Sequence, residues 1–381
     1  LKKIKSIEIT RDTITKDRIP KKQMDIIKSS TYYMNNRQIF VNFINTLFND
    51  YKLELDESEK SDSCERKDNT EFSLLTHQKI VRDYLNLYTP YRGLILYHGL
   101  GSGKTCSSIA IAEGMKSEKQ ILIMTPASLR MNYIEELKKC GDDIYKKNQF
   151  WEFIPVSDED TDKISSLSSI LNLTVDYIKK NRGAWLVNVK KPANFKSLNS
   201  AEQKAVDEQL NEMIRHKYKF INYNGLRSSH LKELTVNFSL NPFDNKVIII
   251  DEAHNFVSRI VNKLKKPEAL SMRLYEYLLN AVNVKIVLLS GTPIINYPNE
   301  LAIMYNILRG YIKTWNIPLN IRTSRKINKT ELSKIFQNIN ILDYIDYKPA
   351  TKMLTITRNP FGYYNIKDKG KYLGVNNIKN K

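Results

Sequence analysis

A glycine-rich segment that ends in lysine and threonine is the clearest chemical signal in the chain. Residues 98–105 read His-Gly-Leu-Gly-Ser-Gly-Lys-Thr, between a short apolar run and a helical stretch. Glycines let the backbone wrap closely around phosphates, and the amides at a helix N-terminus point at the anion. The segment therefore predicts a site for a nucleoside triphosphate. The expected phosphate-binding residues are Gly99, Gly101, Ser102, Gly103, Lys104 and Thr105.

Two side chains of this segment have expected chemical roles. Lys104 should reach the β- and γ-phosphates, and Thr105 should offer its hydroxyl to Mg²⁺. The strict pattern G-x-x-x-x-G-K-[ST] fails at its first position, where His98 stands, and this indicates a subtype of the motif. The alternative is a glycine-rich turn that arose by chance, which the strand and helix patterns on either side disfavour.

A second signal is a pair of carboxylates after an apolar run. Val247–Ile250 is followed by Asp251, Glu252 and, after an alanine, His254. Ligands of open α/β sheets bind at the carboxyl ends of strands. Asp251 is the expected Mg²⁺ partner, and Glu252 is the group expected to orient and deprotonate an attacking water. With Lys104, these carboxylates predict ATP hydrolysis with Mg²⁺ as cofactor.

Other polar residues are candidates for contacts near the nucleotide. Ser290 and Thr292 stand on a tight turn, where their hydroxyls can bond His254 or Asp251; the alternative is an ordinary Ser/Thr turn. Gln78 lies about one helix before the glycine-rich segment, and its amide can both donate to and accept from adenine. The alternative for Gln78 is a solvated side chain at a helix end.

Two further segments are suited to a nucleic-acid backbone. Thr125, Pro126 and Ser128 follow one apolar run, and Tyr223 and Asn224 follow another. Hydroxyl, amide and main-chain N–H groups are common donors to phosphate oxygens. We therefore predict that these residues contact DNA or RNA, with weaker support for the second pair.

Short apolar runs identify the elements that must position these groups. Each run is rich in β-branched residues and continuous, which is typical of a strand buried on both faces. Helical segments separate them, so the sequence predicts an α/β fold with a mainly parallel sheet covered by helices. The runs cover residues 94–97, 121–124, 218–223, 247–250 and 284–289.

The chain divides into three expected parts. Residues 1–72 are interpreted as an N-terminal appendage that ends in an acidic linker. Residues 73–300 hold the motifs and form the expected core domain, with a mostly helical insertion at about 157–216. Residues 301–381 form a basic segment, in which residues 311–381 hold about 14 Lys and Arg against about 4 acids.

The charge and the apolar content narrow the class of protein. Among 381 residues, 60 Lys and Arg against 41 Asp and Glu give a formal net charge of +19. This favours a polyanionic partner such as nucleic acid, and the alternative is a lysine-rich solvated surface. A hydrophobic content of 41% and an aromatic content of 10% exclude a mostly disordered chain.

The sequence gives no reason to expect a membrane partner or secretion. No apolar run approaches the roughly 18 residues of a membrane helix, and no secretory signal is visible. The three cysteines lie far apart and form no CxxC pair, which excludes a disulfide scaffold and a cysteine-based zinc site. We interpret this usage as fitting a reducing compartment.

Together, the motifs resemble those of superfamily 2 helicases. They look like motifs Q, I, Ia, II and III in order, with motif II in its DEAH form, and the resemblance covers roughly residues 72–300. It implies a RecA-like P-loop domain that binds Mg-ATP and moves on a nucleic-acid strand. The motifs are His77-Gln78, 98–105, Thr125–Leu129, Asp251–His254 and Ser290–Pro293.

Three stretches resemble a narrower group. Tyr97–Thr105, Thr125–Leu129 and Arg358–Gly362 look like the helicases of nucleocytoplasmic large DNA viruses, a group that includes poxvirus nucleoside triphosphatase I and the early transcription factor small subunit. The resemblance implies work with the transcription machinery, in the virion or host cytoplasm. For a protein that is not viral, we expect the cytoplasm or the nucleus.

The resemblance also implies a part that the sequence lacks. A complete enzyme of this type has a second RecA-like domain, and after Pro293 we find no second strand set and no arginine-rich motif. We therefore expect the chain to be the N-terminal half of a longer protein, nearly inactive alone.

Three functions stay open. The first is an ATP-driven helicase or translocase. The second is a nucleic-acid-stimulated NTPase that acts as a transcription factor without unwinding duplex. The third is an inert basic scaffold, which the intact Lys104, Thr105, Asp251 and Glu252 disfavour.

Overall fold

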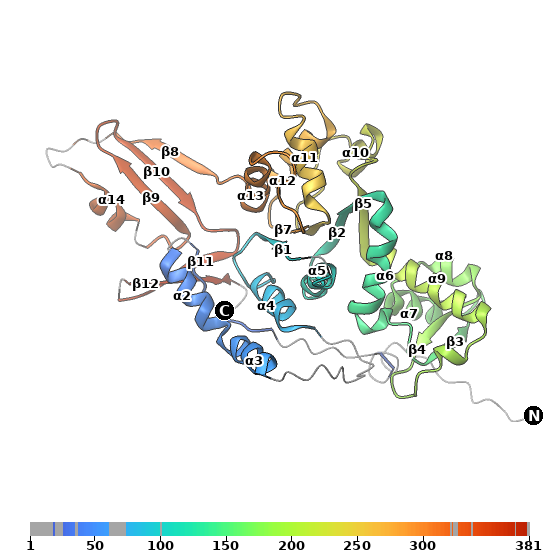
Figure 1. Ribbon diagram of the computed structural model, residues 1–381. Helices are drawn as coiled ribbons and strands as arrows, with labels where there is room; N and C mark the ends of the chain where they lie inside the picture. Colours follow the sequence, from blue (N-terminus) through green and yellow to red (C-terminus); the bar gives the residue numbers. More distant parts are fainter. Residues whose placement is uncertain are drawn as a thin grey trace, which may run out of the picture.

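The centre of the molecule is a five-stranded parallel sheet (Figure 1). The computed structural model describes residues 18–19, 26–34, 37–60, 74–99, 101–320, 322, 327–336, 338–369 and 371–378. The strand order is β1-β7-β6-β2-β5, and every neighbouring pair is parallel. The strands are β1 (Gly93–Tyr97), β2 (Gln120–Thr125), β5 (Tyr218–Asn222), β6 (Lys246–Ile250) and β7 (Lys285–Ser290). The expected α/β fold class is confirmed, and each of the five apolar runs is a strand.

Helices cover both faces of this sheet (Figure 1). Along β6, Val247 and Ile249 enter the apolar cluster on the α5 side, while Ile248 and Ile250 enter the cluster on the α11 side. This alternation is that of a strand buried on both faces. One face carries α4 (Thr76–Tyr84), α5 (Lys104–Glu113), η1 (Ala127–Leu129) and α6 (Arg130–Cys140); the other carries α10 (Ser228–Leu234), α11 (Ala253–Val261), α12 (Leu270–Asn280) and α13 (Asn299–Arg309).

Between α6 and β5 the chain forms a side lobe of mixed structure. Three helices surround two antiparallel strands, so the region expected to be mostly helical also contains a small sheet. The elements are η2 (Asp143–Tyr145), β3 (Trp151–Pro155), α7 (Thr161–Leu171), α8 (Val175–Lys180), β4 (Gly183–Val187), η3 (Phe195–Ser197) and α9 (Ser200–Lys217).

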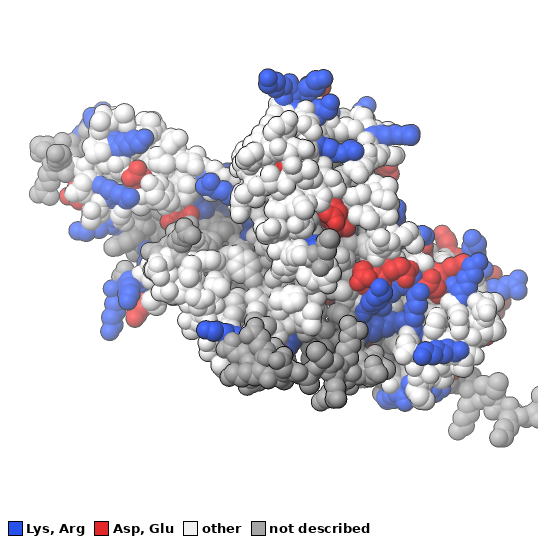
Figure 2. Space-filling view, in the orientation of Figure 1, with Lys and Arg blue, Asp and Glu red and all other residues white. Residues whose placement is uncertain are grey.

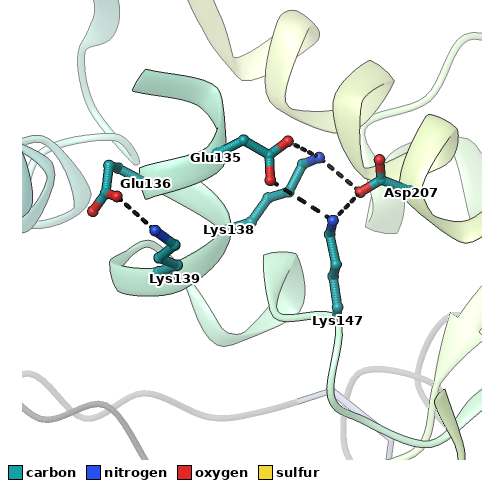
Figure 3. A network of polar contacts seen from close by, with 6 residues as sticks. All are labelled: Glu135, Glu136, Lys138, Lys139, Lys147 and Asp207. Carbon is teal, nitrogen blue, oxygen red and sulfur yellow. Dashed lines mark hydrogen bonds and ion pairs between the residues drawn. The ribbon is translucent and has the colours of Figure 1, made fainter. Parts of the chain in front are cut away.

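A group of charged side chains ties this lobe to α6 (Figure 3). Lys138 of α6 lies 2.7 Å from Asp207 of α9 and 2.8 Å from Glu135, and Lys147 lies 2.6 Å from Asp207. Burial alone would raise the pKa of Asp207, but hydrogen bonds and charge attraction from the two lysines lower it below its ordinary value. The lobe is therefore fixed to the helix that follows segment 125–129.

The N- and C-terminal parts form helices and antiparallel sheets. Residues 54–60 of the expected acidic linker belong to α3, and residues 61–73 lie outside the described part. In the C-terminal part, β8-β10-β9 pack against α14, and Val375 of β12 pairs with Tyr32. The elements are α2 (Arg37–Leu47), α3 (Asn49–Lys60), β8 (Thr314–Pro318), α14 (Lys329–Ile335), β9 (Leu342–Lys348), β10 (Met353–Arg358), β11 (Tyr363–Asp368) and β12 (Lys371–Asn377).

Two sequence expectations concern the whole chain. Within the described ranges, no helix is long and apolar enough to span a membrane. The division into an appendage, a core domain and a basic segment stays a prediction.

A disulfide joins Cys106 and Cys140, whose Cα atoms are 5.6 Å apart. A single bond is not a scaffold, but a disulfide differs from the expectation of a reducing compartment. Cys106 is the third residue of α5 and Cys140 the last of α6. The bond therefore braces the helix that begins at Lys104 against its neighbour.

We expect reduction of this bond to destabilise the protein. The cysteines are 34 residues apart, and a cross-link of that span stabilises by about 4 kcal/mol, chiefly through the unfolded state. Urea unfolding with and without a thiol reductant measures the loss, and Cys140→Ser should show the same loss without reductant. Cys64→Ser is the control. Equal unfolding midpoints for the wild type in both conditions would contradict the cross-link.

Candidate functional site

The loop between β1 and α5 has the backbone that phosphate binding requires. Gly101 and Gly103 have φ of 77° and 74°, in the left-handed region that glycine adopts without strain. Gly103 is the N-cap of α5, and a Cβ added at Gly99 or Gly101 would meet no atom within 4 Å. The loop therefore leaves open space beside a helix N-terminus, where main-chain amides can bind an anion.

The ammonium of Lys104 lies between this loop and the turn after β7. Its Nζ donates to the carbonyl oxygens of His98 at 3.0 Å and Gly99 at 2.9 Å. A Cβ on Gly291 would lie 3.7 Å from the same Nζ. The structure thus brings the predicted phosphate-binding lysine beside the predicted coupling turn.

The side chain of Gln78 hydrogen-bonds the backbone of the glycine-rich loop. Its Nε2 donates to the carbonyl of Gly103 at 3.3 Å, and its Oε1 accepts the N–H of Leu75 at 3.0 Å. The side chain is only 2% exposed. Both ends of the amide are engaged, so the predicted adenine contact is not made by Gln78 in this arrangement.

A pair of histidines flanks the same loop. His77 Nε2 lies 3.1 Å from the carbonyl oxygen of Ser102, and the rings of His77 and His98 meet edge to face at 5.5 Å. Burial, and then the charges of His77 and Lys104, lower the pKa of His98. Both effects favour the neutral form of the ring that replaces the first glycine of the motif.

The carboxylate of Asp251 lies in an environment that disfavours its charge. Burial, followed by the neighbouring charge of Glu252, raises the pKa of Asp251 to about 6. The Glu252 N–H, the Thr125 hydroxyl and the charge of Lys104 act in the opposite direction. A carboxylate of this kind is stabilised by a nearby cation, as expected of an Mg²⁺ partner.

Glu252 is held in a strained backbone conformation. Its φ is 47°, in the left-handed region, which costs free energy for a residue with a side chain. The Tyr223 hydroxyl donates to the carbonyl oxygens of Asp251 at 3.0 Å and Glu252 at 3.1 Å. Tyr223, which is predicted to contact nucleic acid, also supports the acidic pair, and nothing in the sequence pattern signals this second role.

His254 connects the acidic pair to the turn after β7. Its Nδ1 lies 2.9 Å from the Ser290 hydroxyl and 3.4 Å from Glu252 Oε2. The Ser290 hydroxyl also accepts the N–H of Thr292 at 3.1 Å. The structure therefore joins the three predicted coupling residues, although Thr292 takes part through its main chain.

The residues predicted to contact nucleic acid are divided by burial. Thr125 is 0% exposed and Tyr223 is 5% exposed, and Pro126 is buried as well. Little of these three side chains faces the solvent, and their contact with nucleic acid stays a prediction. Ser128 and Asn224 are exposed, so their side chains are accessible to a nucleic-acid backbone.

The donor set fits Mg-ATP. The Thr105 hydroxyl and the Asp251 carboxylate are hard oxygen ligands of the kind Mg²⁺ prefers. Lys104 supplies positive charge beside the glycine loop, and Glu252 is the second carboxylate at the same strand end. The arrangement can hold a triphosphate and place a base close to it.

Comparison with known proteins decides the family. Residues 71–295 match the family described as "Type III restriction enzyme, res subunit". This chain belongs to that family. The matched residues include the five motifs from His77-Gln78 to Ser290–Pro293, so the res-subunit family domain of this chain is a helicase-like ATPase domain.

Relatives of this res-subunit family member are viral. It is 28% identical over 271 residues to "Putative ATP-dependent RNA helicase R563" of Acanthamoeba polyphaga mimivirus, covering 71% of this chain and 38% of that one. It is 24% identical over 269 residues to "Termination factor NPH-I homolog" of African swine fever virus, covering 64% and 30%. The chain thus spans well under half of either relative, and the resemblance to helicases of large DNA viruses is confirmed.

Solved structures also match this chain. The "Sulfolobus solfataricus SWI2/SNF2 ATPase core in complex with dsDNA" is 17% identical, with a TM-score of 0.31, and the match covers 62% of this chain and 35% of that chain.

We expect Asp251→Asn to stabilise the metal-free protein at pH 7.5. The pKa of Asp251 is raised to about 6 from 3.8, so the charged form opposes folding fully above pH 6, and this cost fades as the pH falls toward 4. The effect amounts to up to about 3 kcal/mol.

Urea unfolding in EDTA at several pH values tests this expectation. Asp158→Asn is the control, because that side chain is 88% exposed. A variant at Asp251 that is no more stable than the wild type at pH 7.5 would show that the acidic pair is not strained.

Proposed function

We propose that this chain is the ATP-binding part of an ATP-dependent nucleic-acid helicase or translocase that acts in viral transcription. One observation carries the proposal: Lys104, Asp251, Glu252 and Ser290, from three neighbouring strand ends, meet within the family domain. The names of the relatives support helicase and transcription roles. The proposal includes a second RecA-like domain in the full-length protein, and a virion or host-cytoplasm location.

Each residue has a defined task in the proposed reaction. Lys104 binds the terminal phosphates and offsets the negative charge that they carry. Thr105 and Asp251 would hold Mg²⁺, which neutralises phosphate charge when bound. Glu252 orients the attacking water and accepts its proton. The pair His254 and Ser290 then connects the γ-phosphate side of the site to the turn after β7.

A groove beside Asn224 supports nucleic-acid binding. It has a volume of about 550 Å³ and is lined by Tyr223, Leu226, Arg259 and Lys263, among others. Arg259 donates to the Asn224 carbonyl at 3.4 Å. Figure 2 shows Lys and Arg side chains at the tip of the loop between α11 and α12, which contains Lys263.

A second groove borders the other exposed candidate. It also has a volume of about 550 Å³, shares Leu226 with the first groove, and reaches Ala127, next to Ser128. Lys219 and Lys246 line it; burial, and then the charge of Lys219, lower the pKa of Lys246. Positive side chains therefore border the grooves on both sides of segment 223–226.

A second candidate is a nucleic-acid-stimulated NTPase without unwinding. The relative named "Termination factor NPH-I homolog" favours it. The site residues are the same for both candidates. A strand-displacement assay on the full-length protein separates them, since only a helicase releases the displaced strand.

Lys104→Ala should weaken binding of a fluorescent ATP analogue by at least about 10-fold, because it removes a charged hydrogen-bond donor to the phosphates. Equilibrium titration in Mg²⁺ buffer measures the affinity. Lys139→Ala is the matched control, since Lys139 lies on α6 with its side chain 66% exposed. Unchanged affinity in Lys104→Ala would refute the site assignment.

Binding of a single-stranded oligonucleotide should weaken as salt rises. The variant Arg259→Ala with Lys263→Ala should reduce the log–log slope by about 1 to 1.5, because each lost phosphate contact removes about 0.7. Lys179→Ala with Lys180→Ala, on α8 of the side lobe, is the matched control. If the affinity of the wild type did not change with salt concentration, the positive charge would belong to a solvated surface that does not bind nucleic acid.

A further inference from the structure

Glu300 is a buried carboxylate that the ATP site described above does not use. It is the second residue of α13 and is 0% exposed. One of its oxygens accepts the N–H of Ile295 at 2.7 Å and that of Asn296 at 3.1 Å. Hydrogen bonds from two main-chain amides make the ionised form the favoured one here. Glu300 therefore grips the segment that leads from the turn at Ser290 into its own helix.

The same segment is attached to α11. Asn296 Nδ2 donates to the Ser258 hydroxyl at 3.0 Å, and it lies 3.4 Å from the second oxygen of Glu300. Ser258 is one helical turn after His254, on the same face of α11. Since His254 binds Ser290, segment 290–296 is bonded to α11 at its beginning and again near its end.

Apolar packing does not hold the segment between these two points. Ile294, Ile295 and Tyr297 are 46%, 48% and 54% exposed. An exposed stretch of backbone keeps one conformation only where bonds outweigh its conformational entropy. For this segment, the polar bonds of Glu300 and Asn296 must supply that restraint.

We propose that Glu300 is a positioning residue for the ATP site: through Asn296 and Ser258 it fixes segment 291–298 to the helix that carries His254. The inference rests on the proposed function for its link to ATP. Gly291, at the start of the segment, is next to Lys104. A shift of α11 upon nucleotide binding is thereby passed to the turn and the exposed segment as one unit.

The substitution Glu300→Gln tests the proposal with little change of shape. The amide oxygen can still accept the two N–H groups of Ile295 and Asn296. The amide nitrogen then faces Asn296 Nδ2, which is also a donor, so the bond to the second oxygen is lost and the two remaining bonds lose their charge. Glu276→Gln is the matched control, because Glu276 is a carboxylate on α12 that bonds the Tyr311 hydroxyl at 3.1 Å, in an exposed setting. Asn296→Ala removes the link to Ser258 directly.

Amide hydrogen exchange of the whole chain is measured first without nucleotide. In Glu300→Gln and Asn296→Ala, we expect amides 291–297 to exchange about 10-fold faster, with the central strands unchanged. The double variant should exchange no faster in 291–297 than either single variant, since both substitutions disrupt the same group of hydrogen bonds. Unchanged exchange in 291–297, or an equal increase in every strand, would overturn the proposal.

A second measurement separates positioning from simple stability. With the ATP analogue, wild-type α11 and segment 291–297 should become protected together. In Glu300→Gln, we expect affinity within about 3-fold of the wild type but loss of the added protection in 291–297. Retained protection would overturn the proposal. A wild type that binds no ATP would refute the proposed function, while exchange without nucleotide still decides whether Glu300 holds the segment.

Discussion

The charge of Asp251 is the constraint on which the site depends. The carboxylate lies in a largely buried place beside a second carboxylate, and only part of the cost is offset by Lys104, Thr125 and the N–H of Glu252. Such an arrangement persists only where the surrounding fold is stable by other means. Here the stability comes from strands buried on both faces, of which β6 leads directly into the acidic pair.

The backbone around the acidic pair is held by bonds from outside its own strand. Tyr223, from the end of β5, binds the carbonyls of both acids. Thr125, from the end of β2, faces Asp251. These strand ends meet because parallel strands place all their carboxyl ends at one edge. Because of this topology, two residues expected to bind nucleic acid, Thr125 and Tyr223, lie against the acidic pair.

The fold class could be predicted from the sequence, and so could the strand ends at which the candidate site residues lie. The apolar runs became strands because continuous β-branched runs between helices leave little other choice for burial. Lys104, Asp251, His254 and Ser290 lie near one another because each follows or ends a strand, and neighbouring parallel strands end at the same edge of the sheet. Their chemical roles stay predictions.

The remaining features depend on packing that no spacing reveals. Whether the Gln78 amide faces a ligand or Gly103 depends on the position of α4 against α5. The Cys106–Cys140 bond requires two helices to lie side by side, and Glu300 requires a turn to fold back on its own helix. In each case, which partner a side chain bonds depends on which groups the fold brings close to it. The sequence spacing does not contain that information.

The polar ties also explain how a rigid core can contain a responsive site. A side chain packed among apolar neighbours cannot move without opening a cavity, which is costly. A segment such as 291–298, exposed and held by a few hydrogen bonds, can change its contacts at much lower cost, because water can replace each bond that breaks. The loops at the edge of the sheet are therefore linked by polar bonds, while the strands that carry them are held by apolar packing. In this arrangement α11 contacts the segment after β7 at two points, through His254 and Ser290 at its beginning and through Ser258 and Asn296 near its end.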